Sequence, residues 1–468
     1  MSEGAAKKEE KPRKFQAIRG TRDLLPPEMA LWNRVERIAQ EVFASYSFGE
    51  IRLPVFEATD LFARAVGGET DIVSKEMYTF LDPPVWNEVL EKRGGVEDYD
   101  RVETTFAIKG NLQQSAWMAE VLSFRPEATA SVCRAYIENG MQQLPQPVKL
   151  YTMGPMFRRE RPQKGRYRQF YQIDAEVLGG SDAPGIDAEL IEMVMTFFER
   201  LGLEGVELDI NCIGDKKCRP KYVELLRAEL RKVKDKLGPD SQRRIETNPL
   251  RVLDSKLENE QKLIEGMPHI ADHLCEECGE NYRGVKKELE FRGVKYRENW
   301  RLVRGLDYYS RTTFEITAKG LGSQNAVCGG GRYDGLIELL GGPPTRATGF
   351  AIGEDRLILS LLEAGKTPAA QGRDVYIAWM GEKAYATAVR AAKNLRAAGF
   401  RVELPPVEQK FGKALGQADK LGARYALILG DNEVASGDWT VKTLADGTQQ
   451  KLSESQVLDF LGKNRSGG

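Results

Sequence analysis

The sequence is poor in histidine and cysteine, and it has no long apolar run. Its two histidines, His269 and His273, lie in a charged segment with a helical pattern, which argues against a catalytic triad built on histidine. No run approaches the roughly 20 apolar residues that a membrane-spanning helix needs. Six cysteines in 468 residues, with no apolar secretory signal at the start, predict a protein of the reducing cytoplasm.

Net charge is also nearly absent. Lysine and arginine total 68 against 69 aspartate and glutamate residues, and 41% of the residues are hydrophobic, as in an ordinary soluble protein. Balanced charge argues against nucleic-acid binding over the whole surface, so any polyanion must be met by local patches. The length predicts two to four domains.

The first part of the chain predicts an α+β domain. Residues 1–14 are polar and charged, which predicts a disordered tail. We expect a catalytic domain over 15–361, with a helical insertion at about 216–300 whose pattern is charged. The patterns that support it are helical at 31–44 and 189–203 and strand-like at 51–57, 206–214 and 312–318.

The last hundred residues have a different pattern. Residues 362–373, LEAGKTPAAQGR, are rich in small residues, glycine and proline, which predicts a linker. Beyond it, strand and helix patterns alternate over 374–468. That alternation predicts a separate α/β domain with a largely parallel sheet.

One short segment concentrates positive charge. Residues 157–172, FRRERPQKGRYRQFYQ, contain five arginines and one lysine against one glutamate. Strand patterns on both sides predict a hairpin loop, and Gln172, Asp174 and Glu176 then share one face of the second strand. A polar row beside a basic loop suits a cationic or amide-bearing ligand next to an anionic one. A solvated hairpin with a polar outer face is the alternative.

Two further motifs carry glycine, arginine and tyrosine. Residues 304–316, RGLDYYSRTTFEI, place two arginines, an aspartate and paired tyrosines before a strand. Residues 326–336, AVCGGGRYDGL, contain three consecutive glycines, which allow a ligand to approach the backbone or strands to pack closely. Their spacing is not that of a dinucleotide-binding fold, and the chain has no P-loop.

Cysteine and histidine also occur together. His269, His273, Cys275 and Cys278 form the pattern H-x3-H-x-C-x2-C, a spacing that could bind zinc. The four are spaced more tightly than in a usual zinc finger, and the segment reads as helical. We therefore favour a helical surface with part-buried cysteines and assign no metal site. Cys328 is expected to be a small buried residue rather than a nucleophile.

Several segments in the right order resemble the class II aminoacyl-tRNA synthetases, and within them the histidyl-tRNA synthetase family. The early helix followed by IRLP resembles motif 1, GPMFRRERPQKGRYRQFYQ resembles motif 2 and GFAIGEDRL resembles motif 3. RGLDYYSRTTFE is similar to the histidine-specific signature, and RGTRDLLPPE, TDIVSKEMYTF and RPEATA also match. GKALGQADKLGARYALILGDNE resembles the anticodon-binding domain, so the resemblance covers about 15–461.

The resemblance implies a fold and an activity. The fold is an antiparallel sheet with flanking helices, followed by an anticodon-binding domain. The activity is that of a histidine–tRNA ligase, which activates L-histidine with ATP to histidyl-adenylate and transfers it to the 3′ end of tRNA(His). Mg²⁺ would accompany ATP, and its ligands cannot be identified in the sequence. Motif 1 builds a twofold interface in the family, so a homodimer is expected.

The resemblance also implies roles for individual residues. Arg158 should hold the α-phosphate, Arg304 should act as a second cation beside it, and Arg356 should hold the γ-phosphate end of ATP. The residues expected to bind histidine are Glu127, Ala128, Thr129 and Gln172 around the amino group, and Glu176 and Tyr309, with Tyr308 and Tyr333 nearby, around the imidazole.

Three features depart from the family pattern. Ala128 stands where the family usually has glycine, and we expect a negative φ there, so that alanine costs little. Tyr171 replaces a histidine common in bacterial relatives, a change that we expect to be tolerated. Residues of about 83–123 form an insertion without an assigned role, interpreted as a surface elaboration of a hairpin.

Two other functions compete with a ligase. One is a non-catalytic paralogue, such as the regulatory subunit of ATP phosphoribosyltransferase, which resembles the catalytic core but typically lacks the anticodon-binding domain and an intact histidine-specific signature. The other is an RNA-binding module without catalysis, which the intact set of Arg158, Arg304 and Arg356 argues against. Histidine-dependent ATP–pyrophosphate exchange would separate the ligase from both.

Overall fold

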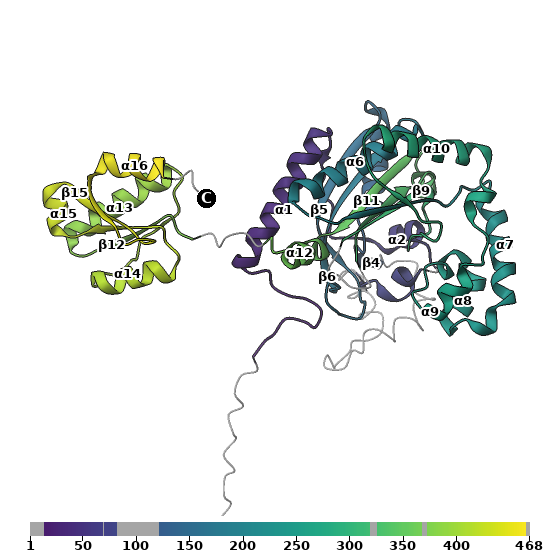
Figure 1. Cartoon of the computed structure of the whole chain (residues 1–468), viewed down its shortest axis with the longest axis horizontal. Helices are drawn as coiled ribbons and strands as arrows, with labels where there is room; N and C mark the ends of the chain where they lie inside the picture. Colours follow the sequence, from purple (N-terminus) through teal and green to yellow (C-terminus); the bar gives the residue numbers. More distant parts are fainter. Residues whose placement is uncertain (1–13, 69, 82–120, 319–324, 367–371, 465–468) are drawn as a thin grey trace, which may run out of the picture. The chain divides into compact units, whose positions relative to one another are not determined.

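The computed structural model describes residues 14–68, 70–81, 121–318, 325–366 and 372–464 (Figure 1). The chain divides into two compact units, one mainly of Trp32–Thr367 and one mainly of Pro368–Gly468. None of the described helices is long and apolar enough to cross a membrane. The predicted tail at 1–14 and the predicted insertion at 83–123 fall almost entirely outside the described residues.

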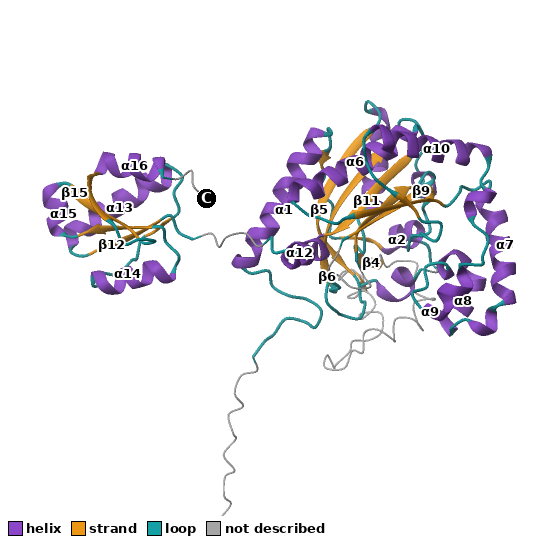
Figure 2. Ribbon diagram, viewed as in Figure 1, coloured by secondary structure: helices purple, strands orange, loops and turns teal. Residues whose placement is uncertain are grey.

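A mostly antiparallel sheet forms the centre of the larger unit (Figure 2). Within the described ranges, eight strands pair in the order β1-β5-β6-β11-β10-β9-β7-β8, and the two outer pairs, β1–β5 and β7–β8, are parallel. This arrangement confirms the predicted α+β class. The strands are β1 (Gly49–Glu50), β5 (Val148–Phe157), β6 (Gln169–Leu178), β7 (Glu207–Cys212), β8 (Arg297–Glu298), β9 (Ser310–Thr317), β10 (Ala326–Arg332) and β11 (Ala347–Gly353).

Amphipathic helices flank this sheet. In the first helix, Trp32, Val35, Val42 and Phe43 are buried at the spacing that the sequence indicates. The helix α6 has Pro184 in its first turn, where a missing N–H costs nothing, and it ends at Gly202 with φ +73°. The helices are α1 (Pro26–Ser45), α2 (Thr59–Val66), α5 (Thr129–Glu138), α6 (Pro184–Leu201), α11 (Leu336–Leu339) and α12 (Glu354–Glu363).

The strand predicted at 51–57 is largely wrong. The structure has β1 ending at Glu50 and a short β2 (Phe56–Ala58), which joins β3 (Thr79–Leu81) and β4 (Val121–Phe124) in a small separate sheet. Pro54 has no N–H to donate to a ladder. Instead, Arg125 Nη1 donates to the carbonyl oxygens of Leu53 at 3.0 Å and Pro54 at 3.3 Å.

The basic hairpin is confirmed. β5 and β6 pair from Val148 with Leu178 to Phe157 with Gln169, so residues 158–168 form the loop between them. Gln172, Asp174 and Glu176 share a face of β6, and they are only 8%, 1% and 1% exposed. The alternative of a solvated polar face is therefore wrong, because the row points into the protein.

The helical segment packs beside the sheet with a core of its own. Its helices are α7 (Arg219–Lys232), α8 (Pro239–Thr247), α9 (Glu258–Ile264) and α10 (Glu276–Phe291). Tyr222, Leu226, Leu230 and Ile245 are buried in that core. The predicted helical character is confirmed, with 3₁₀ turns between the α-helices at Lys234–Lys236, Pro249–Val252 and Ile270–His273.

The C-terminal unit has a mixed sheet in the order β13-β12-β14-β15-β16. Its first three strands are parallel, but β15 and β16 form an antiparallel hairpin, so the predicted sheet is only partly parallel. The hairpin turn contains Gly447, with φ +76° after Asp446, a turn signal that the prediction missed. The strands are β12 (Val375–Trp379), β13 (Val402–Glu403), β14 (Tyr425–Leu429), β15 (Asp438–Thr443) and β16 (Gln449–Ser453), and the helices are α13 (Glu382–Ala397), α14 (Phe411–Lys420), α15 (Asp431–Ser436) and α16 (Glu454–Lys463).

Candidate active site

A cavity of about 280 Å³ brings the predicted site segments together. It is lined by residues of the basic hairpin, of the loop before β9, of β10 and of the start of α12. Five of the residues predicted to bind histidine and all three predicted arginines line it: Glu127, Thr129, Gln172, Tyr308, Tyr309, Arg158, Arg304 and Arg356. Ala128, Glu176 and Tyr333 do not line the cavity.

Three arginines face the cavity from three different elements. Arg158 Nε donates to the carbonyl oxygen of Pro126 at 2.9 Å, and its guanidinium lies over the ring of Phe170. Arg356 donates to the carbonyl oxygens of Gly165 at 3.3 Å and Ala326 at 3.1 Å. Because neither arginine is neutralised by these carbonyl contacts, both keep positive charge available for an anion.

Arg304 lies against the three consecutive glycines. A Cβ on Gly329 would sit 2.0 Å from Arg304 Nη2, so a side chain at this position would displace the guanidinium. Arg304 Nη1 donates to Glu315 Oε2 at 2.7 Å, and Arg304 Nε is buried without a hydrogen-bond partner among the described residues. Gly330 serves strand packing instead, since a Cβ there would meet the carbonyl oxygen of Gly349 at 2.3 Å. Both sequence interpretations of the glycines therefore apply, at neighbouring positions.

Glu127 holds the start of α5. Its two oxygens accept the backbone N–H groups of Thr129 at 3.0 Å and Ala130 at 2.8 Å, while Tyr308 Oη donates to Oε2 at 3.3 Å. Burial raises the pKa of Glu127 despite these donors. This network fixes a carboxylate at one end of the cavity, directly beside the predicted contacts for an amino group.

Glu176 lies one layer behind the cavity wall. Thr129 Oγ1 donates to its Oε1 at 2.7 Å and Tyr333 Oη donates to its Oε2 at 2.5 Å. Gly349 makes room for it, because a Cβ there would overlap Glu176 Oε2. The rings of Tyr308 and Tyr309 pack at 4.8 Å between centroids, and Tyr308 meets Tyr333 edge to face at 5.6 Å. The tyrosines and Glu176 thus form one connected cluster.

Two buried polar side chains lack partners. Gln172 Oε1 and both carboxylate oxygens of Asp174 have no hydrogen-bond partner within the described part of the chain. Burial, together with the negative charge of Glu127, raises the pKa of Asp174 well above its ordinary value. Unpaired buried polar atoms are costly, which points to a ligand that satisfies them or to a site that tolerates the cost for function.

Asp174→Asn is expected to stabilise the free protein increasingly as pH rises. The raised pKa in the folded state means that the wild-type protein is relatively most stable below the unfolded pKa of about 3.9 and loses stability as pH rises toward the folded pKa. Asparagine does not ionise, so it avoids this loss, which has a slope of at most about 1.4 kcal/mol per pH unit. Denaturant unfolding of both proteins between mildly acidic and mildly alkaline pH measures it. A constant difference across that range would contradict a raised pKa.

Sequence reasoning missed Glu315 as a site residue. It lies in β9, two positions before Thr317, and its carboxylate pairs with Arg304 in the cavity. The available signal was its place in RGLDYYSRTTFEI, where it shares a motif with that arginine. Two of the three departures are explained: Ala128 has φ −97°, which confirms the expected negative value, and Tyr171 packs edge to face on Trp32 at 5.3 Å.

A second cavity of about 660 Å³ adjoins the first. The two share Arg158, Arg166 and Arg356 in their linings, and the second continues to the helical segment. Its further basic residues are Lys75, Arg243, Arg244 and Arg251. This positive surface around the mouth of the candidate site suits a polyanion.

Comparison with known proteins agrees with this geometry. The family described as tRNA synthetase class II core domain (G, H, P, S and T) matches residues 117–363, and the anticodon binding domain family matches 374–464. A protein of Solibacter usitatus named histidine–tRNA ligase is 49% identical over 95% of this chain and 98% of its own length. One of Koribacter versatilis with the same name is 47% identical over 97% and 98%.

A solved structure is similar as well. The apo histidyl-tRNA synthetase of S. aureus matches with a TM-score of 0.74 and 34% identity, covering 96% of this chain and all of that one. Sequence identity of this level over nearly the whole of each chain goes beyond a shared fold. The chain therefore belongs to the histidine–tRNA ligase family of class II aminoacyl-tRNA synthetases.

Proposed function

We propose that the first cavity binds histidine and ATP side by side, with the amino acid at the carboxylate end and the phosphates at the arginine end. The chain is a histidine–tRNA ligase: it activates L-histidine with ATP to histidyl-adenylate and transfers the histidyl group to the 3′ end of tRNA(His). The observation that carries the proposal is that a buried polar set including unpaired Gln172 and three arginines line the same cavity.

The arginines serve the first step. The histidine carboxylate attacks the α-phosphorus of ATP, the bond from that phosphorus to the bridging oxygen breaks, and pyrophosphate leaves with the electron pair. Negative charge gathers on the α-phosphate as this happens, and preorganised cations stabilise it without moving. Arg158 and Arg304 supply that charge, and Arg356 holds the γ-phosphate end of ATP.

Mg²⁺ enters with ATP as part of the substrate. The carboxylates of Glu160 and Glu315 line the cavity beside the arginines, and carboxylate oxygen is a ligand type that Mg²⁺ accepts. Glu160 would hold the ion near the phosphates, because the Glu315 carboxylate is already paired with Arg304. Bound there, Mg²⁺ neutralises phosphate charge.

The acidic end selects histidine. Glu127, Thr129 and Gln172 receive the amino group, with Ala128 shaping the backbone beside them. Tyr309, with Glu176 behind it and Tyr308 and Tyr333 nearby, faces the imidazole. An imidazole needs a partner on each nitrogen, and a wrong amino acid leaves buried polar groups unpaired at about 1–3 kcal/mol each.

The tRNA reaches this cavity from the basic side. The basic hairpin loop and the adjoining second cavity receive the acceptor end, and the C-terminal unit, matched by the anticodon binding domain family, reads the anticodon. We place the boundaries of this division at a catalytic domain of 15–361 and an anticodon-binding domain of 374–468. Motif 1 makes the enzyme a homodimer, and the six cysteines, all free, suit the cytoplasm.

Histidine-dependent ATP–pyrophosphate exchange tests the proposal directly. Exchange should occur with histidine and Mg²⁺–ATP, and not when another amino acid replaces histidine. Aminoacylation of tRNA(His) should follow with the same preparation. A protein that binds tRNA yet gives no exchange with histidine would contradict the proposed cavity.

Glu176→Gln is expected to raise the KM for histidine tenfold or more and to leave the KM for ATP nearly unchanged. The substitution keeps the shape but puts an amide where Thr129 and Tyr333 donate to a carboxylate, which disturbs the tyrosine cluster that faces the imidazole. A tenfold change corresponds to about 1.4 kcal/mol. Glu176 lies about 13 Å along the strand from Gln172, so the substitution is remote from the contact proposed for the amino group.

Both constants are measured by pyrophosphate exchange. Glu199→Gln, an exposed acid on α6, is the matched control and should change neither constant. If the constant for ATP moves and that for histidine does not, Glu176 is not the partner of the imidazole.

A further inference from the structure

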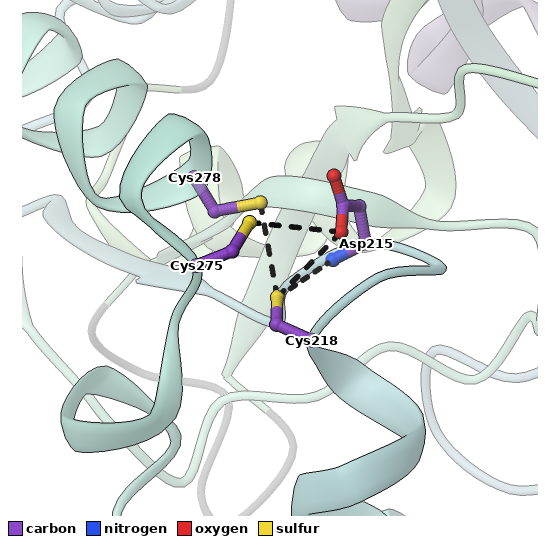
Figure 3. A group of neighbouring side chains, drawn as sticks. All are labelled: Asp215, Cys218, Cys275 and Cys278. Atoms are coloured by element: carbon purple, nitrogen blue, oxygen red, sulfur yellow. Dashed lines mark hydrogen bonds between the residues drawn. The ribbon is translucent and has the colours of Figure 1, made fainter.

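Three cysteines and one aspartate meet where the helical segment joins the main sheet (Figure 3). Asp215 follows β7 and Cys218 immediately precedes α7, whereas Cys275 immediately precedes α10 and Cys278 lies in its first turn. One ligand atom from each of the four lies within 4.8 Å of the other three. Figure 3 shows the sulfur atoms and the Asp215 carboxylate pointing toward one another. None of the four lines the first cavity.

The separations match a tetrahedral metal centre. Cys218 Sγ lies 3.6 Å from Asp215 Oδ1 and 3.9 Å from Cys278 Sγ, and Cys275 Sγ lies 3.9 Å from Asp215 Oδ1. A tetrahedral Zn²⁺ with sulfur at about 2.3 Å and oxygen at about 2.0–2.2 Å separates its ligand atoms by about 3.5–3.8 Å. Small side-chain rotations therefore suffice to close the group on one ion.

The backbone holds the ligands in place. The backbone N–H of Asp215 donates to Cys218 Sγ at 3.4 Å, and the N–H of Lys217 donates to Asp215 Oδ1 at 2.9 Å. Gly214 has φ +66°, and a Cβ there would lie 2.8 Å from Cys218 Sγ. Cys218 and Cys275 each occupy the position immediately before a helix.

A cation lies beside the group. Arg311 Nε is 3.8 Å from Asp215 Oδ2, and Arg311 Nη2 is 4.0 Å from Glu277 Oε2. Arg311 has φ +51°, a left-handed conformation that is costly outside glycine, and its backbone N–H donates to the carbonyl oxygen of Gly214 at 2.8 Å. Three thiolates and a carboxylate on a divalent ion leave a charge of −2. The guanidinium offsets only part of it, because its shortest ion pair is with Asp182 at 3.0 Å.

The ligand set differs from the one that the sequence spacing offered. His269 stacks on Trp300 at 3.9 Å and the ring of His273 lies 5.9 Å from that of Tyr222, so neither histidine belongs to the group. Their places are taken by Asp215 and Cys218, which lie about 60 residues earlier in the chain. Cys275 and Cys278 are common to both sets, in a C-x2-C spacing typical of a zinc knuckle.

We propose that Asp215, Cys218, Cys275 and Cys278 form a structural Zn²⁺ site that fastens the first turns of α7 and α10 to the end of β7. The three thiols lose their protons to solvent on binding, and Zn²⁺ has no redox change to undergo. All four positions carry protein ligands, as in structural rather than catalytic zinc sites. The site stabilises the helical segment. Arg311, which lies beside the site, is in β9, and Tyr308 and Tyr309 directly precede that strand.

Metal analysis of the full-length protein tests the site. The protein, purified without chelator, should contain about one zinc per chain, and the metal-free protein should bind Co²⁺ with the visible bands of a tetrahedral thiolate centre. Cys275→Ser should lose this stoichiometric zinc and lower the Tm. Cys212→Ala is the matched control, because Cys212 is buried in β7 outside the group, and it should keep zinc.

Asp215→Cys tests the site without removing a metal ligand, so its result does not depend on a variant that fails to fold. It supplies a fourth thiolate, so the protein should keep one zinc and show stronger thiolate-to-Co²⁺ charge transfer. Chelation of the wild-type protein should lower its Tm, whereas chelation of Cys275→Ser should not change its Tm further. A wild-type protein that holds no zinc and does not bind added Zn²⁺ or Co²⁺ overturns the proposal.

Two further outcomes would also overturn it. Zinc retained by Cys275→Ser and lost by Cys212→Ala would show the wrong ligand set. A disulfide between Cys218 and Cys278, found by non-reducing mass analysis after alkylation, would mean that their proximity serves a covalent bond instead.

Discussion

Arg304→Ala is expected to lower the rate of histidyl-adenylate formation by about 10²–10³-fold, with the fold intact. Arg304 lines the cavity, and its guanidinium occupies the space that a side chain at position 329 would take. Arg304 Nε has no hydrogen-bond partner among the described residues, so its N–H can donate to the α-phosphate. Negative charge gathers on that phosphate in the transition state. Pre-steady-state and pyrophosphate-exchange rates measure the loss, and circular dichroism and the Tm report the fold.

Two companion variants separate charge from structure. Arg301→Ala removes an arginine three residues earlier that does not line the cavity, and it should leave the rate within about twofold. Arg304→Ala alone leaves the Glu315 carboxylate unpaired, so the double variant Arg304→Ala/Glu315→Gln removes both partners. The double variant should remain as slow as the single one. Recovery to within tenfold of the wild-type rate would mean that Arg304 only neutralises Glu315.

Local patterns predicted most of the fold correctly. Apolar periodicity located α1 and α6, because each helix buries one face against the sheet. Strand-forming residues located β6 and β9, although both strands are buried on both faces. The failure at 51–57 has a different cause. There the chain is extended without a ladder because Pro54 cannot donate and Arg125, distant in sequence, takes the carbonyl groups.

The candidate site could be predicted only in part. The family resemblance located the arginines, since each lies in a distinctive motif. Alternation alone could not tell whether the face with Gln172, Asp174 and Glu176 was buried or solvated. Burial depends on α5 and β11 lying beside β6, which are contacts far apart in sequence. The group of Asp215, Cys218, Cys275 and Cys278 was the hardest to predict from the sequence. Its first two members lie about 60 residues before the other two, so only the fold brings them together.

Removal of the C-terminal unit is expected to separate the two reactions of the enzyme. A chain ending at Gln371 keeps every residue that lines the first cavity, so histidine-dependent pyrophosphate exchange should stay within about twofold of the full chain. Aminoacylation should fall by about 10²-fold or more in kcat/KM for tRNA, because a second, linked contact adds about 10²–10⁴ to the affinity for a ligand that spans both units.

The C-terminal unit has a hydrophobic core of its own, so it can be removed without cutting into the core of the larger unit. Val375, Ile377, Leu395 and Leu427 belong to a hydrophobic cluster of its own, so the cut does not divide a core. As the matched control, a short Gly/Ser insertion at 367–371 keeps both units and should change aminoacylation only a few-fold, since a longer flexible linker lowers effective concentration slowly. Equal losses of exchange and aminoacylation in the truncated chain, with the protein folded and its oligomeric state unchanged, would contradict the division of labour. Retained aminoacylation would instead show that the first unit alone recognises the tRNA.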